Sequence, residues 1–432
     1  MALPKTSERR VFLFLQGPSS PIFAKIAGRL EARGHHCLRI NLNPGDQIFW
    51  RRKGGHNFRG RGGDEWHAYV TSFMDRHGVT DLILLGEERP YHQIAIGAAR
   101  ERAVEISVVE MGYLRPDWLT LERDGMSSNS HFPADPGQII EAARPLAEPD
   151  WTRRYTQSFA AEAGYDLLYN LPNVFLWFLF PHYRRHALSH PLAEYAGWVM
   201  RLAGGRRRKR AATALIDNLL AGATPFFVFP LQLQTDFQLR AHSPYNDQRE
   251  AITEVLTSFA NYAPSEARLV VKVHPLDNGL IDWQTYVAGL ATRLGIDRRI
   301  QFLDGGDLGA LLGRAAGTVT VNSTVGLHAL QIGKPVKVLG AAVFNIAKLS
   351  DQAELDQFWG APRPPEETIR AAFFRLLAAA IQVRGNFYSA AGTDGGAEAI
   401  AQRLHERSVN KPGGFVDPPP RLRPAKRSAS RF

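Results

Sequence analysis

TVTVNSTVGLHALQIGKPVKVLG, residues 318–340, predicts a strand, a helix and a second strand in immediate succession. The run TVTVN (318–322), with four β-branched residues, is typical of a buried strand, and the hydroxyl groups of Ser323 and Thr324 are suited to capping the first turn of a helix. GKP (333–335) then ends the helix before the second strand. Because neighbouring parallel strands need such a crossover, the stretch predicts an open parallel sheet covered by helices.

The same alternation of strands and helices forms two separate series along the chain. The first series predicts strands at 11–16, 36–42, 80–86 and 104–110, with helices near 21–33, 64–77 and 91–102. The second series predicts strands at 225–231, 268–274, 300–303, 318–322 and 335–340, with helices near 247–260, 283–295, 307–315 and 325–332. Each series is typical of one doubly wound, Rossmann-like α/β domain.

These patterns divide the chain into five parts. We expect a first Rossmann-like domain at 1–150, a helical connecting segment with apolar and basic residues at 151–212, a second Rossmann-like domain at 213–350, C-terminal helices at 351–408 and a disordered basic tail at 409–432. Two Rossmann-like domains that face a cleft, followed by helices, describe the GT-B architecture of glycosyltransferases. Epimerases and phosphorylases share that architecture, so it does not by itself specify a function.

The net charge of +10 is concentrated in two stretches. Residues 201–210 and 411–432 contribute six cations each, against the single acid Asp417, and the rest of the chain is close to neutral. This distribution favours local docking on phosphate groups or an anionic membrane, with a solvated loop and tail as the alternative. It disfavours a nucleic-acid-binding protein, whose basic residues are interleaved with stacking aromatic side chains.

Composition and missing motifs exclude further classes. With 44% hydrophobic residues the chain can form sizeable cores, which excludes a disordered scaffold. The polar start MALPKTSERR is not expected to be a signal peptide, and no apolar run approaches the length of a membrane-spanning helix. The single cysteine, Cys37, fits a reducing compartment such as the cytoplasm. Because P-loop, dinucleotide-binding, HExxH and paired CxxC motifs are absent, we expect no cofactor and no metal.

Polar residues that follow the predicted strands are the candidates for a site, because ligands of open parallel sheets bind beyond the carboxyl ends of the strands. In the first series they are Gln16, Gly17 and Ser19 after the first strand, and Glu110, Arg115 and Asp117 at the end of the fourth. A glycine and free backbone donors at a helix start suit an anionic sugar, although any strand-to-helix turn needs similar residues. A buried carboxylate such as Glu110 is functional or forms a structural ion pair.

The second series has a longer set of such residues. They are Gln232, Gln234, Asp236 and His242 after the first strand, Lys272, His274 and Pro275 at the end of the second, and Ser323 and Thr324 after the fourth. The glutamines are suited to binding sugar hydroxyl groups or to capping the next helix. The two hydroxyl residues at a helix N-terminus predict a phosphate site, with plain helix capping as the alternative.

Seven segments, which contain most of these residues, resemble the bacterial capsule polysaccharide biosynthesis family typified by KpsS and LipB. They are FLFLQGPSSPIF, NLNPGDQIFW, LLGEERPYH, VEMGYLRPDWLTLER, PLQLQTDFQLRAHSPY, KVHPLD and VNSTVGLHALQIGKPV, and they span about residues 10 to 345. The resemblance implies a retaining β-Kdo transferase that uses CMP-Kdo as donor and a lyso-phosphatidylglycerol lipid as acceptor, at the cytoplasmic face of the inner membrane. It also implies a first domain for the acceptor and a second for the nucleotide sugar, and contact with other capsule assembly and export proteins.

The resemblance assigns roles to particular residues. Glu110 takes the first acidic place of an acid-acid-Gly motif, His274 and Pro275 correspond to a His-Pro motif that holds CMP, and Ser323 with Thr324 corresponds to the phosphate site. Met111 stands where related transferases have an aspartate, so Asp236 and Asp117 remain alternatives for the catalytic carboxylate. The candidates for binding the Kdo carboxylate are Lys272, Arg115 and Arg89.

Two alternative functions remain open at this stage: a sugar-nucleotide epimerase on the same fold, and a non-enzymatic adaptor for polysaccharide export. For the transferase, LPNVFLWFLFPHYRRH (171–186) and the cations at 206–210 predict docking on the inner-membrane surface. The alternative is a buried helix between domains, with Phe175, Trp177 and Phe178 in a core.

Overall fold

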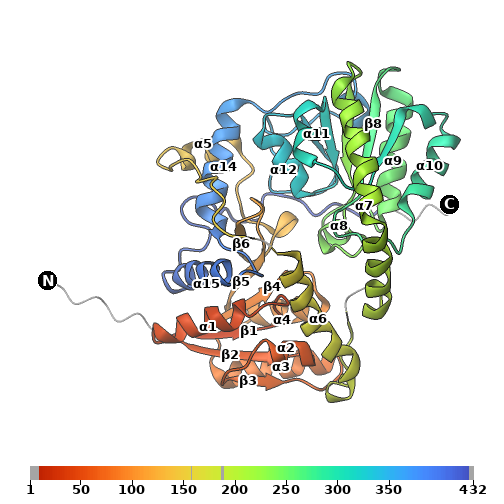
Figure 1. The fold of residues 1–432 in the computed structure, drawn as a ribbon. Helices are drawn as coiled ribbons and strands as arrows, with labels where there is room; N and C mark the ends of the chain where they lie inside the picture. Colours follow the sequence, from red (N-terminus) through yellow and green to blue (C-terminus); the bar gives the residue numbers. More distant parts are fainter. Residues whose placement is uncertain (1–8, 157, 186–188, 428–432) are drawn as a thin grey trace. The chain divides into compact units, whose positions relative to one another are not determined.

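The computed structural model describes residues 9–156, 158–185 and 189–427, which divide into two compact units (Figure 1). Unit 1 takes its residues from 1–132, 149–186 and 376–418, and unit 2 takes its residues from 133–148, 187–375 and 419–432. Among the described residues, no helix is both long enough and apolar enough to cross a membrane.

Unit 1 is built on a seven-stranded sheet. Its strands are β1 (Val11–Phe14), β2 (His36–Asn41), β3 (Gly55–Asn57), β4 (Asp81–Leu85), β5 (Glu105–Met111), β6 (Trp118–Arg123) and β12 (Gln382–Arg384), in the order β12-β6-β5-β4-β1-β2-β3. β1 to β5 run parallel, whereas β6 is antiparallel to both of its neighbours. Its helices are α1 (Ile22–Ala32), α2 (Pro44–Ile48), α3 (Asp64–His77), α4 (Pro90–Arg100), α6 (Phe159–Phe175) and α15 (Ala390–His405), with the 3-10 turns η1 (Ser127–Asn129) and η2 (Trp177–Leu179).

Both faces of the first sheet are apolar, because successive side chains of a strand point to opposite faces and both faces are covered by helices. Phe12 and Phe14 of β1 pack with α1 and α15 in one core, whereas Leu13 packs with α3 and α4 in the other. Trp66 of α3, which is fully buried, is the largest side chain of this second core. α1 and α4 therefore leave the sheet on opposite faces.

Unit 2 is built on a five-stranded, entirely parallel sheet. Its strands are β7 (Phe226–Pro230), β8 (Arg268–Lys272), β9 (Ile300–Leu303), β10 (Gly317–Thr320) and β11 (Val336–Val338), in the order β11-β10-β7-β8-β9. Its helices are α5 (Pro136–Ala143), α7 (Pro191–Ala221), α8 (Phe237–Ala241), α9 (Gln248–Tyr262), α10 (Trp283–Arg293), α11 (Leu308–Arg314), α12 (Thr324–Gln331) and α13 (Leu355–Phe358), with the 3-10 turn η3 (Asp297–Arg299). α14 (Glu367–Ile381) begins in unit 2 and ends in unit 1.

The two sheets share one topology, which confirms the predicted α/β class of two Rossmann-like, doubly wound domains. In each, the first strand lies centrally, the second and third strands follow on one side, and the fourth and fifth lie on the other. The order therefore reverses between β1 and β4 in unit 1 and between β7 and β10 in unit 2. Polar groups at the carboxyl ends of these strand pairs lie where such sheets bind their ligands.

The observed units differ from the expected boundaries because the chain returns to unit 1. The predicted C-terminal helices 351–408 are not a separate part: β12 pairs with β6, and α15 packs on α1. The predicted connecting segment 151–212 is likewise divided, with α6 in unit 1 and α7 in unit 2. The strands β6 and β12 were not predicted, since a six-residue hairpin partner and a three-residue strand after a long helix have weak patterns.

The expected disordered tail is corrected by the structure for residues 409–427. In unit 1, Asn410 donates from Nδ2 to the Gly414 carbonyl oxygen at 2.7 Å. In unit 2, Lys426 donates from Nζ to the Tyr245 carbonyl oxygen at 2.7 Å. Arg421 donates to the carbonyl oxygens of Pro133, Ala342 and Val343 at 2.8–3.1 Å. Cations that were expected in a solvated tail thus satisfy main-chain carbonyl groups, and the last part of that tail, 428–432, lies outside the described residues.

The three hydrogen bonds of Arg421 give the first prediction. Arg421→Met is expected to lower the free energy of unfolding by about 2 kcal/mol, because it leaves main-chain carbonyl groups without their donor. The matched control is Leu422→Ala, whose side chain is 90% exposed and whose removal is expected to change nothing. Chemical denaturation of both variants measures the difference. If Arg421→Met and the unmodified protein are equally stable, the expectation of a disordered tail would be supported instead.

Candidate functional site

The carboxyl ends of β7 and β10 are joined by a pair of amide side chains. Gln232 donates from Nε2 to Asn322 Oδ1 at 2.8 Å, and the Asn322 backbone N–H donates to Gln232 Oε1 at 3.2 Å. Asn322 also donates from Nδ2 to the Gln238 carbonyl oxygen at 2.8 Å. Because Gln232 is buried, these hydrogen bonds hold both amide side chains in place where the strand order reverses.

Two other residues predicted after β7 cap helices, which is the alternative role given for such residues above. Gln234 accepts from the Gln248 backbone N–H at 3.0 Å and donates to Asp247 at 3.1 Å, at the start of α9. Asp236 accepts from the Gln238 backbone N–H at 2.8 Å and is the N-cap of α8.

His242 follows α8 and is fully buried in unit 2. Burial lowers the pKa of His242 to about 3, and the positive charges of Arg423 and Lys426 act in the same direction. Its imidazole is therefore neutral at physiological pH.

The end of β8 combines a buried cation with a histidine of defined tautomer. Burial lowers the pKa of Lys272, while the negative charge of Asp304 opposes that effect. His274 Nδ1 accepts from the Leu276 backbone N–H at 3.0 Å, so in the neutral ring the proton lies on Nε2. Pro275 is exposed directly beside it. His274 thus has an Nε2 donor at the carboxyl end of β8, as a phosphate site requires.

Asp304, which follows β9, brings two arginines of α7 to the same edge. Arg201 contacts Asp304 at 2.7 Å and Arg208 contacts it at 3.2 Å. Together with Lys272, three cations therefore surround one carboxylate and leave an excess of positive charge. Sequence analysis missed Asp304, and it assigned both arginines to a solvated or membrane-binding basic stretch because α7 lies far from β9 in sequence.

The N-terminus of α12 is capped as the sequence predicts. Ser323 Oγ accepts from the Val325 backbone N–H at 3.3 Å, and the Ser323 N–H donates to Thr320 Oγ1 at 3.1 Å. Thr324 is the first residue of the helix and is half-buried. Capping is therefore one role of Ser323, and binding of a phosphate group at this helix end remains a prediction.

In unit 1, residues after β1 and β2 form a buried network with α6. Gln16 donates from Nε2 to the hydroxyl groups of Tyr169 at 2.7 Å and Tyr183 at 3.0 Å. Asn43 donates to the Tyr169 hydroxyl group at 3.0 Å, and Tyr169 donates to Asp46 at 3.2 Å. The predicted sugar-binding residue Gln16 therefore positions the segment that contains α6.

The segment Asn43–Asp46 is the part of this network that sequence analysis did not single out as a site. Asp46 is fully buried and forms a 2.9 Å ion pair with Arg39. A Cβ atom on Gly45 would lie 2.6 Å from the Tyr169 carbonyl oxygen, so only glycine allows this close approach. The available signal was the Asn-Pro-Gly-Asp tetrapeptide, which is typical of a capped turn.

The other residues predicted after β1 serve the turn into α1. A Cβ atom on Gly17 would lie 2.7 Å from the Phe23 ring, so glycine is required there for packing. Ser19 forms a hydrogen bond with Tyr388, which follows β12. This supports the structural alternative for the turn.

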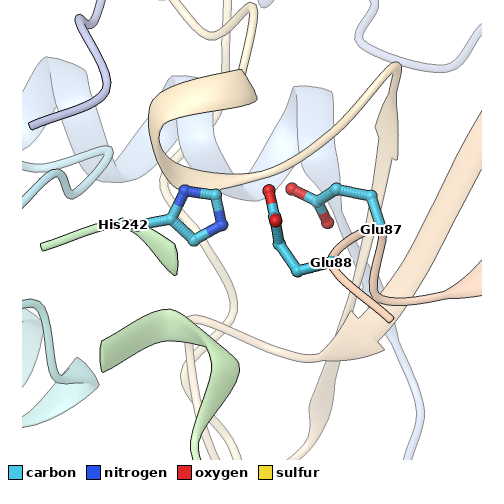
Figure 2. Close-up of side chains that lie close together, drawn as sticks. All are labelled: Glu87, Glu88 and His242. Carbon is cyan, nitrogen blue, oxygen red and sulfur yellow. The ribbon is translucent and has the colours of Figure 1, made fainter. Parts of the chain in front are cut away.

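Two carboxylates that sequence analysis missed, Glu87 and Glu88, follow β4 (Figure 2), and the predicted Glu110 lies at the end of β5. Glu87 accepts from the Met126 backbone N–H at 2.8 Å, and Asn129 Nδ2 lies 3.1 Å from Glu87 and 2.9 Å from Glu88. Burial raises the pKa of Glu87 from its ordinary 4.5 to about 7, against the lowering effect of its hydrogen bonds. Glu110 lies half-buried at the end of β5. An ideal Cβ atom on Gly86 would lie 3.3 Å from Glu110 Oε2, so Glu110 is close to the chain just before Glu87.

The remaining residues predicted in unit 1 lie nearby in sequence but differ in environment. Arg89 is the N-cap of α4 and lowers the pKa of Tyr169 and Tyr183 through its charge, although burial raises both overall. Arg115 is exposed in the turn between β5 and β6. Asp117 is buried and accepts from the backbone N–H groups of Arg154 and Tyr155, which indicates a structural role.

The fold and these strand-end groups define a protein of two Rossmann-like units with a cationic edge in unit 2. The family model described as "Capsule polysaccharide biosynthesis protein" matches residues 80–388. The chain belongs to this family.

Individual relatives match most of the chain. The chain is 30% identical over 381 residues to the capsule polysaccharide export protein KpsS of Escherichia coli, covering 87% of this chain and 96% of that protein. It is 30% identical over 386 residues to the capsule polysaccharide modification protein LipB of Neisseria meningitidis, covering 87% and 91%. Among solved structures, the KpsC β-Kdo 2,7 transferase of Thermosulfurimonas dismutans aligns over 92% of this chain and 99% of its own, with 14% identity and a TM-score of 0.44.

The raised pKa of Glu87 gives a prediction for stability. The native state holds the carboxyl proton up to about pH 7, whereas the unfolded state releases it near 4.5, so this contribution to stability is lost as pH rises through that window. Glu87→Gln removes this titration. The free energy of unfolding of the variant minus that of the unmodified protein is therefore expected to be about 3 kcal/mol larger at pH 8 than at pH 4. Denaturation at both pH values measures this. A difference that does not change with pH would contradict it.

Proposed function

We propose that the protein is a capsule polysaccharide glycosyltransferase, which transfers β-Kdo from CMP-Kdo to a lyso-phosphatidylglycerol acceptor. The observation that carries the proposal is the set of groups suited to phosphate at the carboxyl edge of the second sheet: His274, Lys272 and the N-terminus of α12. Membership of the capsule polysaccharide biosynthesis family supports the pathway. The donor and the acceptor are those that the resemblance of the seven sequence segments to this family implies.

Unit 2 is suited to the nucleotide. A phosphate group at the N-terminus of α12 accepts from the hydroxyl groups of Ser323 and Thr324, at the positive end of the helix dipole. The Nε2–H of His274 and the ammonium group of Lys272 add charge-assisted donors at the carboxyl end of β8, which is separated from β10 by β7. These groups stabilise CMP as it leaves with the electron pair of the broken bond between the anomeric carbon and oxygen, without a metal.

Unit 1 supplies the carboxylates. Net retention at the anomeric carbon requires either a carboxylate nucleophile with a second acid/base group or a front-face displacement. We assign the catalytic carboxylate to Glu110. In the double-displacement route, Glu87 has a pKa suited to accepting the acceptor hydroxyl proton at neutral pH.

The other predicted carboxylates are less suited to this role. Asp117 is buried among backbone N–H groups, and Asp236 caps α8. Arg89 and Arg115, on the same unit as Glu110, remain our candidates for the Kdo carboxylate.

The direct test is incubation of purified protein with CMP-Kdo and labelled lyso-phosphatidylglycerol, followed by mass spectrometry. We expect a product heavier by one Kdo unit, with release of CMP. Glu110→Gln is expected to lower turnover by about 100-fold or more with little change in KM for the donor. The matched control is Glu105→Gln at the opposite end of β5, which is expected to retain turnover.

Any of three outcomes would contradict the proposal. Full turnover by Glu110→Gln would transfer the catalytic role to Glu87 or Asp236. A failure to form the lipid product, with conversion of a free sugar nucleotide instead, would favour an epimerase, and binding of polysaccharide without any conversion would favour an export adaptor.

The nucleotide site gives a separate prediction. The double variant Ser323→Ala and Thr324→Ala is expected to raise the KM for CMP-Kdo about tenfold, and His274→Ala to weaken CMP binding similarly, because each loses a donor to phosphate. The KM for the lipid acceptor is expected to stay unchanged. The control is Ser389→Ala, which removes the N-cap hydroxyl group of α15 in unit 1. If the double variant leaves the donor KM unchanged, as the control is expected to do, the serine and threonine act only through helix capping.

A further inference from the structure

Unit 1 contains a cavity of about 650 Å³ that is lined by the start of α4 and by the chain that follows η2. Its lining includes Arg61, Tyr91, Tyr183, Arg184 and Arg185. The rings of Tyr91 and Tyr183 stack at 5.9 Å between centroids, and the Arg184 backbone N–H donates to the Tyr91 hydroxyl group at 3.3 Å. The cavity wall is therefore held by the N-terminal turn of α4 on one side and by the chain after η2 on the other.

The cavity is strongly cationic. Arg61, Arg184 and Arg185 are among its lining residues, and the lining contains no acidic residue. Among the described residues, none of these three guanidinium groups has a carboxylate partner; the nearby Glu65 accepts instead from the Arg61 backbone N–H at 2.7 Å. Three like charges around one cavity repel one another unless an anion is bound, so the arrangement suits a phosphate group.

An exposed apolar cluster lies just before the cavity-lining residues 181–185 in the sequence. Phe175, Trp177 and Phe178, at the end of α6 and in η2, are 64, 62 and 58% exposed. The alternative that these three side chains lie in a core is therefore wrong. Large aromatic side chains beside arginines are typical of segments that enter the interfacial region of a bilayer.

We propose that the cavity binds the phosphate group of a membrane glycerophospholipid, while Phe175, Trp177 and Phe178 contact its acyl chain at the bilayer surface. Charge complementarity selects an anionic headgroup, and the aromatic cluster selects a ligand with an apolar tail. The binding itself stands independently of the transferase activity. Only the identification of this lipid as the acceptor rests on the proposed function.

The basic stretch 206–210 of α7 is a weaker candidate for the same role. Arg208 contacts Asp304 at 3.2 Å, so one of its charges is already compensated. The exposed apolar residues of α7, such as Val199 and Met200, include no aromatic side chain beside these cations. We therefore assign lipid binding to unit 1.

The test is cosedimentation of the full chain with vesicles of phosphatidylglycerol and phosphatidylcholine, in the absence of any sugar donor. The triple variant Arg61→Gln, Arg184→Gln, Arg185→Gln is expected to bind anionic vesicles on the order of 100-fold more weakly and to lose most of the salt dependence. The matched control removes three exposed cations elsewhere on unit 1: Arg51→Gln, Lys53→Gln, Arg59→Gln. It is expected to bind within about threefold of the unmodified protein.

The proposed contact of the aromatic cluster with the acyl chain is tested by Trp177→Ser. Because Trp177 is exposed, we expect an unchanged thermal unfolding temperature and roughly tenfold weaker vesicle binding. Equal loss of binding in both triple variants would overturn the proposal, as would full binding by the first. Tight binding of soluble glycerol phosphate with no affinity for vesicles would also overturn it, because it would make the cavity a site for a soluble anion. Because no donor is used, failure of this assay is distinguishable from failure of the transfer assay.

Discussion

The reciprocal hydrogen bonds between Gln232 and Asn322 link the ends of β7 and β10, between which the strand order of the second sheet reverses. At such a point the crossovers diverge, and polar groups at the strand ends have no helix above them. The two amide side chains bond to one another there, and His274 after β8 and the N-terminus of α12 after β10 lie at the same edge of the sheet. The phosphate site that we propose depends on this pair.

Burial determines the charge of the groups around that edge. It lowers the pKa of His242 to about 3, so this histidine adds no positive charge, and it lowers the pKa of Lys272, which Asp304 opposes. In unit 1 it raises the pKa of Glu87 to about 7. The outcome is a cationic edge in unit 2 and a set of carboxylates in unit 1, of which one is poised near neutrality.

In unit 1, a buried network has a role like that of the Gln232–Asn322 pair in unit 2. It consists of Gln16, Asn43, Asp46 and Tyr169. It attaches α6 to the ends of β1 and β2 through buried hydrogen bonds. The same helix ends in the exposed aromatic cluster and leads into the arginines of the cavity. A polar network inside the unit thus holds an apolar and basic segment on its surface, which is what a lipid-binding segment requires.

The sequence by itself determined the two series of strands and helices, the N-cap at Ser323 and the polar strand ends, because all of these depend on local periodicity and capping chemistry. It did not reveal β12 and α15 joining the first sheet, nor Asp304 meeting Arg201, since those contacts join residues far apart in the chain. It left both burial and exposure open for Trp177, and only tertiary packing decided between them. Charge states were likewise decided by the structure, because Glu87 and a solvated glutamate have the same side chain and differ only in the burial that the fold imposes.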